Sequence, residues 1–139
     1  MKIDYIGMLL EFHRKYRHYE FFGHSVDNET IDLRIRLIDE EVNKELLPAL
    51  ESLKGSDHLT TQQWFEKMIE TSDAVADSLY VIFGTCISLG IPIDEIFTEV
   101  HRSNMTKSLE KTKYGKTIKG PNFELPRLKE IYERYLRQG

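Results

Sequence analysis

The chain has 139 residues, of which 40% are hydrophobic and 30% are charged, and its net charge at pH 7 is −4. This length suits one domain with a real core, and a lone Cys86 excludes a disulfide framework and a cysteine metal knuckle. The acidic balance disfavours a general nucleic-acid binder. Met1–Asp4 lacks the apolar start of a signal peptide, and we find no run of ~20 apolar residues that would span a membrane. We therefore expect a cytoplasmic protein.

Apolar residues recur at helical spacing along most of the chain. This pattern predicts helices over residues 2–18, 29–53, 61–89 and 93–109, and a terminal helix that begins at Pro126. Pro48 falls inside the second segment, where we expect a kink or a break. The stretch 110–124, rich in Lys, Gly and Pro, predicts a loop. No segment has the period of a strand, so we expect an all-α fold, a helical bundle of about five helices in a single domain over residues 1–139.

Acidic residues dominate the first hundred positions and basic residues dominate the rest. Residues 1–100 hold 9 Lys/Arg and 19 Asp/Glu, whereas residues 101–139 hold 10 and 4. Acids also recur at helical spacing inside two apolar segments, as Glu40, Glu41 and Glu45 and as Glu70, Asp73 and Asp77. A carboxylate at a helix interface is costly unless a positive charge meets it, so these clusters predict a site for Mg²⁺ or Mn²⁺. The alternative is a solvated acidic face, although Asp77 interrupts a strongly apolar helix.

A basic segment follows the acidic ones. Six cations lie within 18 residues, namely Arg102, Lys107, Lys111, Lys113, Lys116 and Lys119, and Gly115 and Gly120 let the backbone approach a ligand. Beside a metal site, such a segment predicts that a polyphosphate is bound. Lysine content alone is equally consistent with an exposed basic loop that has no partner.

Four blocks of the sequence resemble a known family. They are 37–43 (LIDEEVN), 76–85 (ADSLYVIFGT), 97–107 (FTEVHRSNMTK) and 115–126 (GKTIKGPNFELP). Together they are similar to the MazG-like all-α nucleoside triphosphate pyrophosphohydrolases, and most of all to the phosphoribosyl-ATP pyrophosphohydrolase-like branch. The resemblance implies a four-helix core completed by oligomerisation, as a homodimer or homotetramer, and dependence on Mg²⁺. It also implies hydrolysis of an NTP or dNTP to the monophosphate and pyrophosphate, a nucleotide-pool housecleaning reaction.

The resemblance also implies roles for individual residues. The metal ligands would be Glu41, Glu45, Asp73 and Asp77, with Glu70 as a further candidate, and Glu40 would orient or deprotonate the attacking water. Substrate contacts would come from Arg102, Asn104, Lys107, Lys116 and Lys119. The spacing differs from the family pattern, which places two acids three residues apart in each block. Here those positions hold Lys44 and Ala74, and the acids are four residues apart.

Two other readings stay open. The residues Lys44 and Ala74 favour a non-catalytic nucleotide-binding or interaction protein on the same fold, with a degenerate metal site. A small nucleic-acid binder that uses residues 102–119 is disfavoured by the acidic remainder of the chain.

Overall fold

The computed structural model describes the backbone of residues 1–21 and 25–138 and the side chains of residues 1–21 and 25–135. Throughout this part of the chain the regular elements are helical, and the one β-type pairing is an isolated bridge between Lys111 and Thr117. The predicted all-α class is therefore confirmed. The chain divides into two compact units, Met1–Ile91 and Pro92–Gly139, and each is described by itself.

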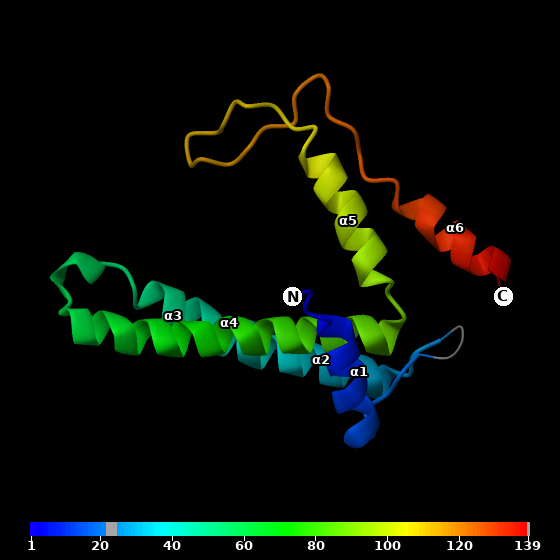
Figure 1. Ribbon diagram of the computed structural model, residues 1–139, viewed down its shortest axis with the longest axis horizontal. Helices are drawn as coiled ribbons and strands as arrows, with labels where there is room; N and C mark the ends of the chain where they lie inside the picture. Colours follow the sequence, from blue (N-terminus) through cyan, green and yellow to red (C-terminus); the bar gives the residue numbers. More distant parts are fainter. Residues whose placement is uncertain (22–24, 139) are drawn as a thin grey trace. The chain divides into compact units, whose positions relative to one another are not determined.

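The first unit is built from three helical rods. They are α1 (Tyr5–Lys15), a continuous rod made of α2 (Asn28–Ile38), a π-helical segment (Asp39–Leu46) and α3 (Leu47–Glu51), and the long α4 (Thr61–Leu89). Figure 1 shows the middle rod running antiparallel beside α4, with α1 also packed on α4. If the middle rod counts as one helix, the described chain has five, as the sequence predicts.

Side chains in the sequence explain where these helices begin and end. The carboxylates of Asp4 and Asp27 accept hydrogen bonds from first-turn backbone N–H groups of α1 and α2. Thr60 and Gln63 form a reciprocal capping box at the start of α4. Gly90 then ends α4 with a left-handed φ of 68°, a conformation that glycine adopts without strain.

The helix does not break at Pro48, so of the two predicted outcomes the break is wrong and the kink stays a prediction. The helix changes its hydrogen bonding instead, since the π segment ends at Leu46 and α-helix resumes at Leu47. Pro48 then occupies the first turn of α3, where its missing N–H needs no partner. An eight-residue π segment is unusual, and such segments are found disproportionately at functional sites.

Small residues line the side of α4 that is buried. Thr71, Ala74 and Ser78 are all buried, as is Gly84 farther along the helix. Small side chains let neighbouring helix backbones approach closely. The Ser78 hydroxyl uses this proximity to donate a 3.2 Å hydrogen bond to the Glu41 backbone carbonyl, which ties the π segment to α4. Cys86 is buried nearby, as predicted, and its burial raises the thiol pKa.

The second unit pairs α5 (Ile93–Asn104) with α6 (Leu128–Gln138). Between them the basic segment folds back on itself, because the Ser108 N–H donates to the Ile118 carbonyl at 2.9 Å and the Ile118 N–H donates to the Glu110 carbonyl at 3.2 Å. Gly115, with a φ of 85°, turns the chain at the tip. The predicted loop is thus a hydrogen-bonded hairpin that carries Lys111, Lys113 and Lys116.

By length and composition alone, α4 is apolar enough to cross a membrane, with 29 residues and a mean hydropathy of 1.2 over its most apolar stretch. We did not expect such a segment from the sequence. The same properties belong to core helices of soluble proteins, and α4 carries Asp73 and Asp77, which would be costly in hydrocarbon. The hydropathy of α4 is therefore weak evidence for a membrane span.

Candidate metal and phosphate site

Carboxylates from two antiparallel helices converge on Glu41. This side chain is half-buried on the π segment, and burial raises its pKa first. The negative charges of Asp77, Glu45, Glu40 and Asp73 raise the Glu41 pKa further, in that order, and no cation among the described residues counters them. Four of the predicted site residues therefore lie near enough to a fifth, Glu41, for their charges to act on it. Glu70, the remaining candidate, is exposed and does not contribute to the Glu41 shift.

The π segment accounts for the four-residue spacing of Glu41 and Glu45. Each π hydrogen bond spans one residue more than an α-helical bond, so a π turn takes more than four residues. In a π-helix, a residue four positions after Glu41 therefore lies slightly less than one full turn from it. In an α-helix of 3.6 residues per turn, a residue three positions later lies slightly less than one turn away. Glu45 thereby takes the side of the helix that the family's three-residue spacing would give.

The two residues that depart from the family pattern do not enter the acidic cluster. The Lys44 ammonium lies 3.4 Å from Asp39, whose other oxygen accepts a 2.8 Å hydrogen bond from Asn43. Ala74 is 4% exposed and belongs to the small-residue contact between α4 and its neighbours. Neither residue therefore neutralises Glu41.

The cluster fits a divalent cation by its chemistry, though it is open. Asp77 is half-buried, whereas Glu40, Glu45 and Asp73 are exposed. Among the described residues, no three His, Cys, Asp or Glu side chains come together closely enough to hold a metal as they stand. Carboxylate oxygen is nonetheless the ligand that Mg²⁺ and Mn²⁺ prefer, and their charge would relieve the repulsion around Glu41.

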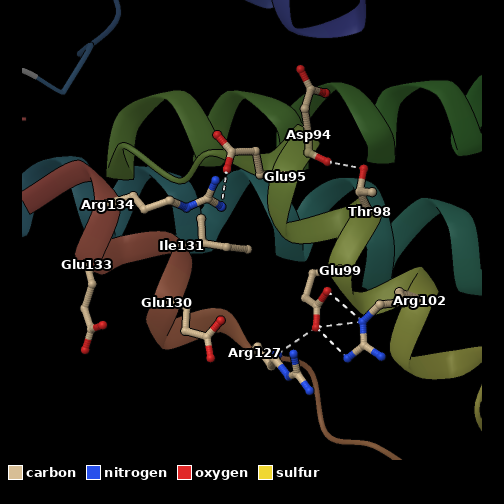
Figure 2. A pocket seen from close by; sticks show the side chains of 10 residues that line it. All are labelled: Asp94, Glu95, Thr98, Glu99, Arg102, Arg127, Glu130, Ile131, Glu133 and Arg134. Carbon is tan, nitrogen blue, oxygen red and sulfur yellow. Dashed lines mark hydrogen bonds and ion pairs between the residues drawn. The ribbon is translucent and has the colours of Figure 1, made fainter.

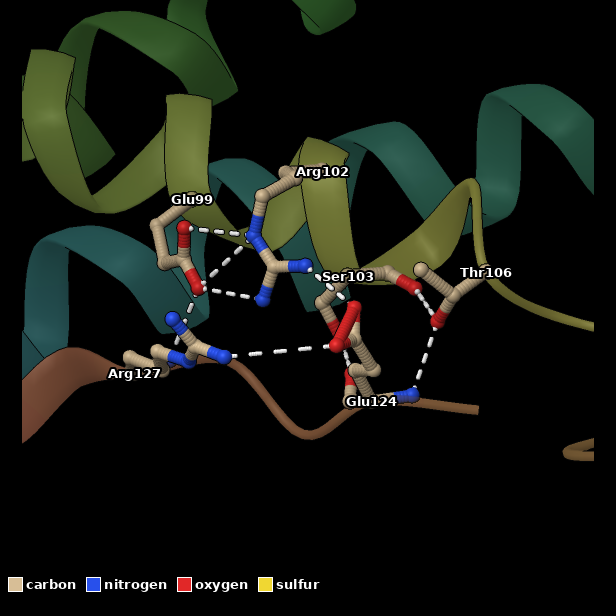
Figure 3. A network of polar contacts seen from close by, with 6 residues as sticks. All are labelled: Glu99, Arg102, Ser103, Thr106, Glu124 and Arg127. Carbon is tan, nitrogen blue, oxygen red and sulfur yellow. Dashed lines mark hydrogen bonds and ion pairs between the residues drawn. The ribbon is translucent and has the colours of Figure 1, made fainter. Parts of the chain in front are cut away.

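Charged groups in the second unit satisfy one another (Figure 3). The Arg102 guanidinium donates to both Glu99 oxygens, at 2.8 Å from Nη2 and 2.9 Å from Nε, and to Glu124 at 2.9 Å. Glu99 also accepts a 2.9 Å bond from the Arg127 backbone N–H. Chiefly because of Arg102, the Glu99 pKa falls to about 2. Arg102, which was predicted to bind substrate, thus has its donors engaged within the protein.

The same ion pairs line an open groove of about 800 Å³ between α5 and α6, shown in Figure 2. At its other end, Glu95 accepts hydrogen bonds from Arg134 at 2.8 Å and from the Tyr135 hydroxyl at 2.6 Å. Ile131, 5% exposed, supplies the apolar contact. These pairings hold α5 and α6 together through complementary charges along the groove.

The remaining predicted substrate contacts also belong to the second unit. Asn104 is exposed at the end of α5, and Lys116 and Lys119 are exposed on the basic segment, whereas Lys107 is half-buried. The Lys119 ammonium lies 5.2 Å from the centre of the Phe123 ring, a cation–π contact that leaves it open to anions. Within the described residues, these three lysines form no ion pair.

One polar group in the first unit was missed by the sequence analysis. Arg34 is only 6% exposed, and it lies between Ile31, Ile35 and Ile38 on the apolar stripe of α2. A charge at a core position is the signal that singled out Asp77, and it would have found Arg34 too.

An all-α fold in which two antiparallel helices bring carboxylates together defines a class: helical proteins with an acidic cluster suited to a divalent cation. Residues 13–104, about two thirds of the chain, match the phosphoribosyl-ATP pyrophosphohydrolase family. The chain belongs to this family, within the MazG-like all-α superfamily, and the resemblance is confirmed. Membership indicates a pyrophosphohydrolase, an enzyme that acts on phosphoanhydride bonds. No curated protein matches the chain.

Proposed function

We propose that this protein hydrolyses a nucleoside triphosphate, NTP or dNTP, to the monophosphate and pyrophosphate, with Mg²⁺ or Mn²⁺ as cofactor. The observation that carries the proposal is that the charges of Asp77, Glu45, Glu40 and Asp73 all raise the Glu41 pKa, with no compensating cation among the described residues. Family membership supports the reaction type, and the matched residues include the whole acidic cluster.

Each group has a defined task in this proposal. Glu41, Glu45, Asp73 and Asp77 hold the cation, which when bound polarises the phosphate oxygens. Glu40 accepts a proton from a water whose oxygen attacks phosphorus. The bond between the α-phosphorus and the oxygen that bridges it to the β-phosphate breaks, and its electron pair leaves with pyrophosphate. Cations of the basic segment, Lys107, Lys116 and Lys119, neutralise charge on the phosphates, and Asn104 hydrogen-bonds the ligand.

A second candidate substrate is phosphoribosyl-ATP, which the name of the matching family favours. Both candidates carry a triphosphate, and hydrolysis of either one between the α- and β-phosphates releases pyrophosphate. They differ at the base, which in phosphoribosyl-ATP bears an additional phosphorylated sugar.

Exposed apolar side chains support a homo-oligomer, dimer or tetramer, as the working form. On the middle rod Ile35 is 61% and Leu47 is 51% exposed, and on α4 Phe65 is 59% and Ile69 is 69% exposed. Monomeric proteins rarely expose large apolar patches of this kind. Light scattering at micromolar concentration tests this point, and a stable folded monomer would contradict it.

The activity is tested by pyrophosphate release from a panel of NTPs, dNTPs and phosphoribosyl-ATP, each with Mg²⁺ and with EDTA. We expect metal-dependent release from at least one triphosphate. The matched control is Glu66→Gln, because Glu66 is an exposed acid on α4 that does not act on Glu41. If no member of the panel is hydrolysed while nucleotides still bind, the non-catalytic alternative replaces this proposal.

A further inference from the structure

A buried hydroxyl on α4 bonds across to the middle rod instead of to its own helix. Serine and threonine side chains inside a helix often donate to the carbonyl four residues earlier. On α4, the buried Thr71 hydroxyl does so, with a 2.8 Å bond to the Lys67 carbonyl. Ser78 is only 3% exposed, yet its hydroxyl donates at 3.2 Å to the Glu41 carbonyl, 37 residues away. This bond therefore links two helices rather than two turns of one helix.

The carbonyl that accepts the Ser78 bond lies inside the π segment. In an α-helix this carbonyl would pair with the N–H four residues later, at Glu45, whereas in a π-helix its partner lies five residues later, at Leu46. A side chain that inserts into the hydrogen-bond ladder of a helix is a recognised cause of local distortion. A donor held at the Glu41 carbonyl competes with the shorter α pairing and so favours the π register.

A second contact on the middle rod also suits the π register. The Asp39 carboxylate accepts a 2.8 Å bond from Asn43 and lies 3.4 Å from the Lys44 ammonium, so it contacts residues four and five positions later. In an α-helix the neighbours of a side chain are three and four positions away. Because the Asp39–Lys44 pair is exposed and screened by solvent, we assign the larger effect to the buried bond from Ser78.

Both ends of the Ser78 bond adjoin candidate metal ligands. Ser78 directly follows Asp77 on α4, and its acceptor is the backbone of Glu41. The bond thus holds the two helices together at the point where the Asp77 charge acts on Glu41. The register of the π segment also sets the side of the rod on which Glu45 lies.

We propose that Ser78 is a positioning residue for the candidate metal site. Its hydroxyl holds the π register of Asp39–Leu46, and this register keeps Glu45 on the same side of the rod as Glu41. Ser78 acts through the backbone and is not itself a metal ligand, because it is buried and donates its proton to a carbonyl. Groups that orient metal ligands contribute strongly to metal affinity. This inference rests on the proposed function for the identity of the site.

The first arm of the test follows the π segment without metal. Amide hydrogen exchange, measured by NMR in EDTA, reports the local stability of the hydrogen bonds of residues 43–46. Ser78→Ala should speed the exchange of these amides by about tenfold, as the loss of one hydrogen bond implies, and leave the amides of α2 unchanged. The matched control is Thr71→Val, which removes a buried hydroxyl whose bond stays within α4.

The second arm measures metal affinity directly, by titration with Mn²⁺ well below the melting temperature. Ser78→Ala should bind Mn²⁺ roughly tenfold more weakly than the wild type, the effect typical of a group that orients metal ligands. Thr71→Val should bind like the wild type. Ser78→Thr keeps the hydroxyl and should restore both the affinity and the slow exchange. If Ser78→Ala fails to fold, Ser78→Cys takes its place, since its thiol fills a similar volume and is a weak donor.

The two arms together separate a positioning role from a merely structural one. Unchanged Mn²⁺ affinity in Ser78→Ala would overturn the proposal, and so would a loss of affinity without faster exchange in the π segment. A wild type that binds no Mn²⁺ would reject the metal site of the proposed function. The exchange arm alone then confirms or overturns the hold of Ser78 on the π segment, so the two failures are distinguished.

Discussion

Two charged clusters, one in each unit of the chain, differ in how far neighbouring side chains compensate them. In Pro92–Gly139, Arg102 pairs with Glu99 and Glu124, and Arg134 pairs with Glu95, so the groups that line the groove are largely satisfied. In Met1–Ile91, the charges of other carboxylates raise the Glu41 pKa, and the Nε and Nη1 atoms of buried Arg34 have no hydrogen-bond partner among the described residues. The groove charges are compensated within their unit, whereas the described residues do not compensate Glu41 or these two Arg34 atoms.

That contrast has an energetic basis. A charge removed from water needs compensation, and the second unit supplies it from its own side chains. In the first unit, Arg34 precedes Glu41 by seven residues on the middle rod, and Asp73 and Asp77 lie on α4. The repulsion around Glu41 is costly in the free protein, and under our proposal a divalent cation relieves it.

The strongest test of the contrast is to remove a charge on the unsatisfied side. Asp77→Asn should lower metal-dependent pyrophosphate release by about 100-fold or more, because it removes a ligand and the developing charge loses its stabilisation. Glu66→Gln should change little. The same assay on Asp73→Asn and Glu70→Gln identifies which acids of α4 the cation uses. Full activity of Asp77→Asn would place the site elsewhere.

On the satisfied side, the Glu99→Gln variant should lose stability rather than activity. The Glu99 pKa is depressed to about 2, so its contribution is present above the unfolded value of about 4.5 and is lost as pH falls toward 2. The melting temperature of the wild type should therefore fall steeply as pH is lowered across that range. The melting temperature of the variant should depend less on pH. Parallel profiles for the two proteins would mean that the ion pairs contribute nothing measurable.

Glu41 should show the opposite dependence on pH. Its pKa is raised, first by burial and then by Asp77, so the folded protein loses stability as pH rises through that pKa. In EDTA above neutral pH, Glu41→Gln should therefore melt a few degrees higher than the wild type. Mg²⁺ should raise the melting temperature of the wild type and leave the variant unchanged. A variant that melts lower in EDTA would show that Glu41 is compensated in the free protein.

The smallest effect is expected on the basic segment. Lys119→Ala should weaken triphosphate binding about three- to tenfold and monophosphate binding less. An exposed cation contributes modestly to the binding free energy, and its contribution grows with the negative charge of the ligand. Lys129→Ala, at an exposed lysine on α6, serves as the control. Equal loss for both nucleotides would assign Lys119 to the fold, through its contact with Phe123.

Periodicity and capping residues made most of the fold predictable. The limits of α4 follow from Thr60 and Gly90, whose local chemistry acts over a few residues. The outcome at Pro48 did not follow, because a proline in a helical pattern is compatible with a break or with a change of helix type. The choice depends on contacts with α4, such as the bond from Ser78 to the Glu41 carbonyl, which lie 37 residues apart in sequence.

The roles predicted for the site residues stay predictions, and the structure shows where each of these residues lies. Asp77 stood out because a carboxylate in an apolar helix needs an explanation, and the structure brings it to Glu41. Arg102 was grouped with the phosphate-binding cations because nothing local shows that Glu124, 22 residues away, takes up one of its donors. Arg34, like Asp77, is a charged residue within an apolar helical pattern. The sequence analysis applied this criterion only to acidic residues and so missed Arg34.

The central claim is that the carboxylates around Glu41 form a divalent-cation site, and direct metal binding tests it most closely. Mn²⁺ binding, followed by electron paramagnetic resonance of the free ion, should reveal a site in the wild type that Mg²⁺ competes for. Asp77→Asn and Glu41→Gln should abolish this site, and Glu66→Gln should retain it. A wild-type protein that binds no Mn²⁺, or variants that bind it as tightly as the wild type, would contradict the account.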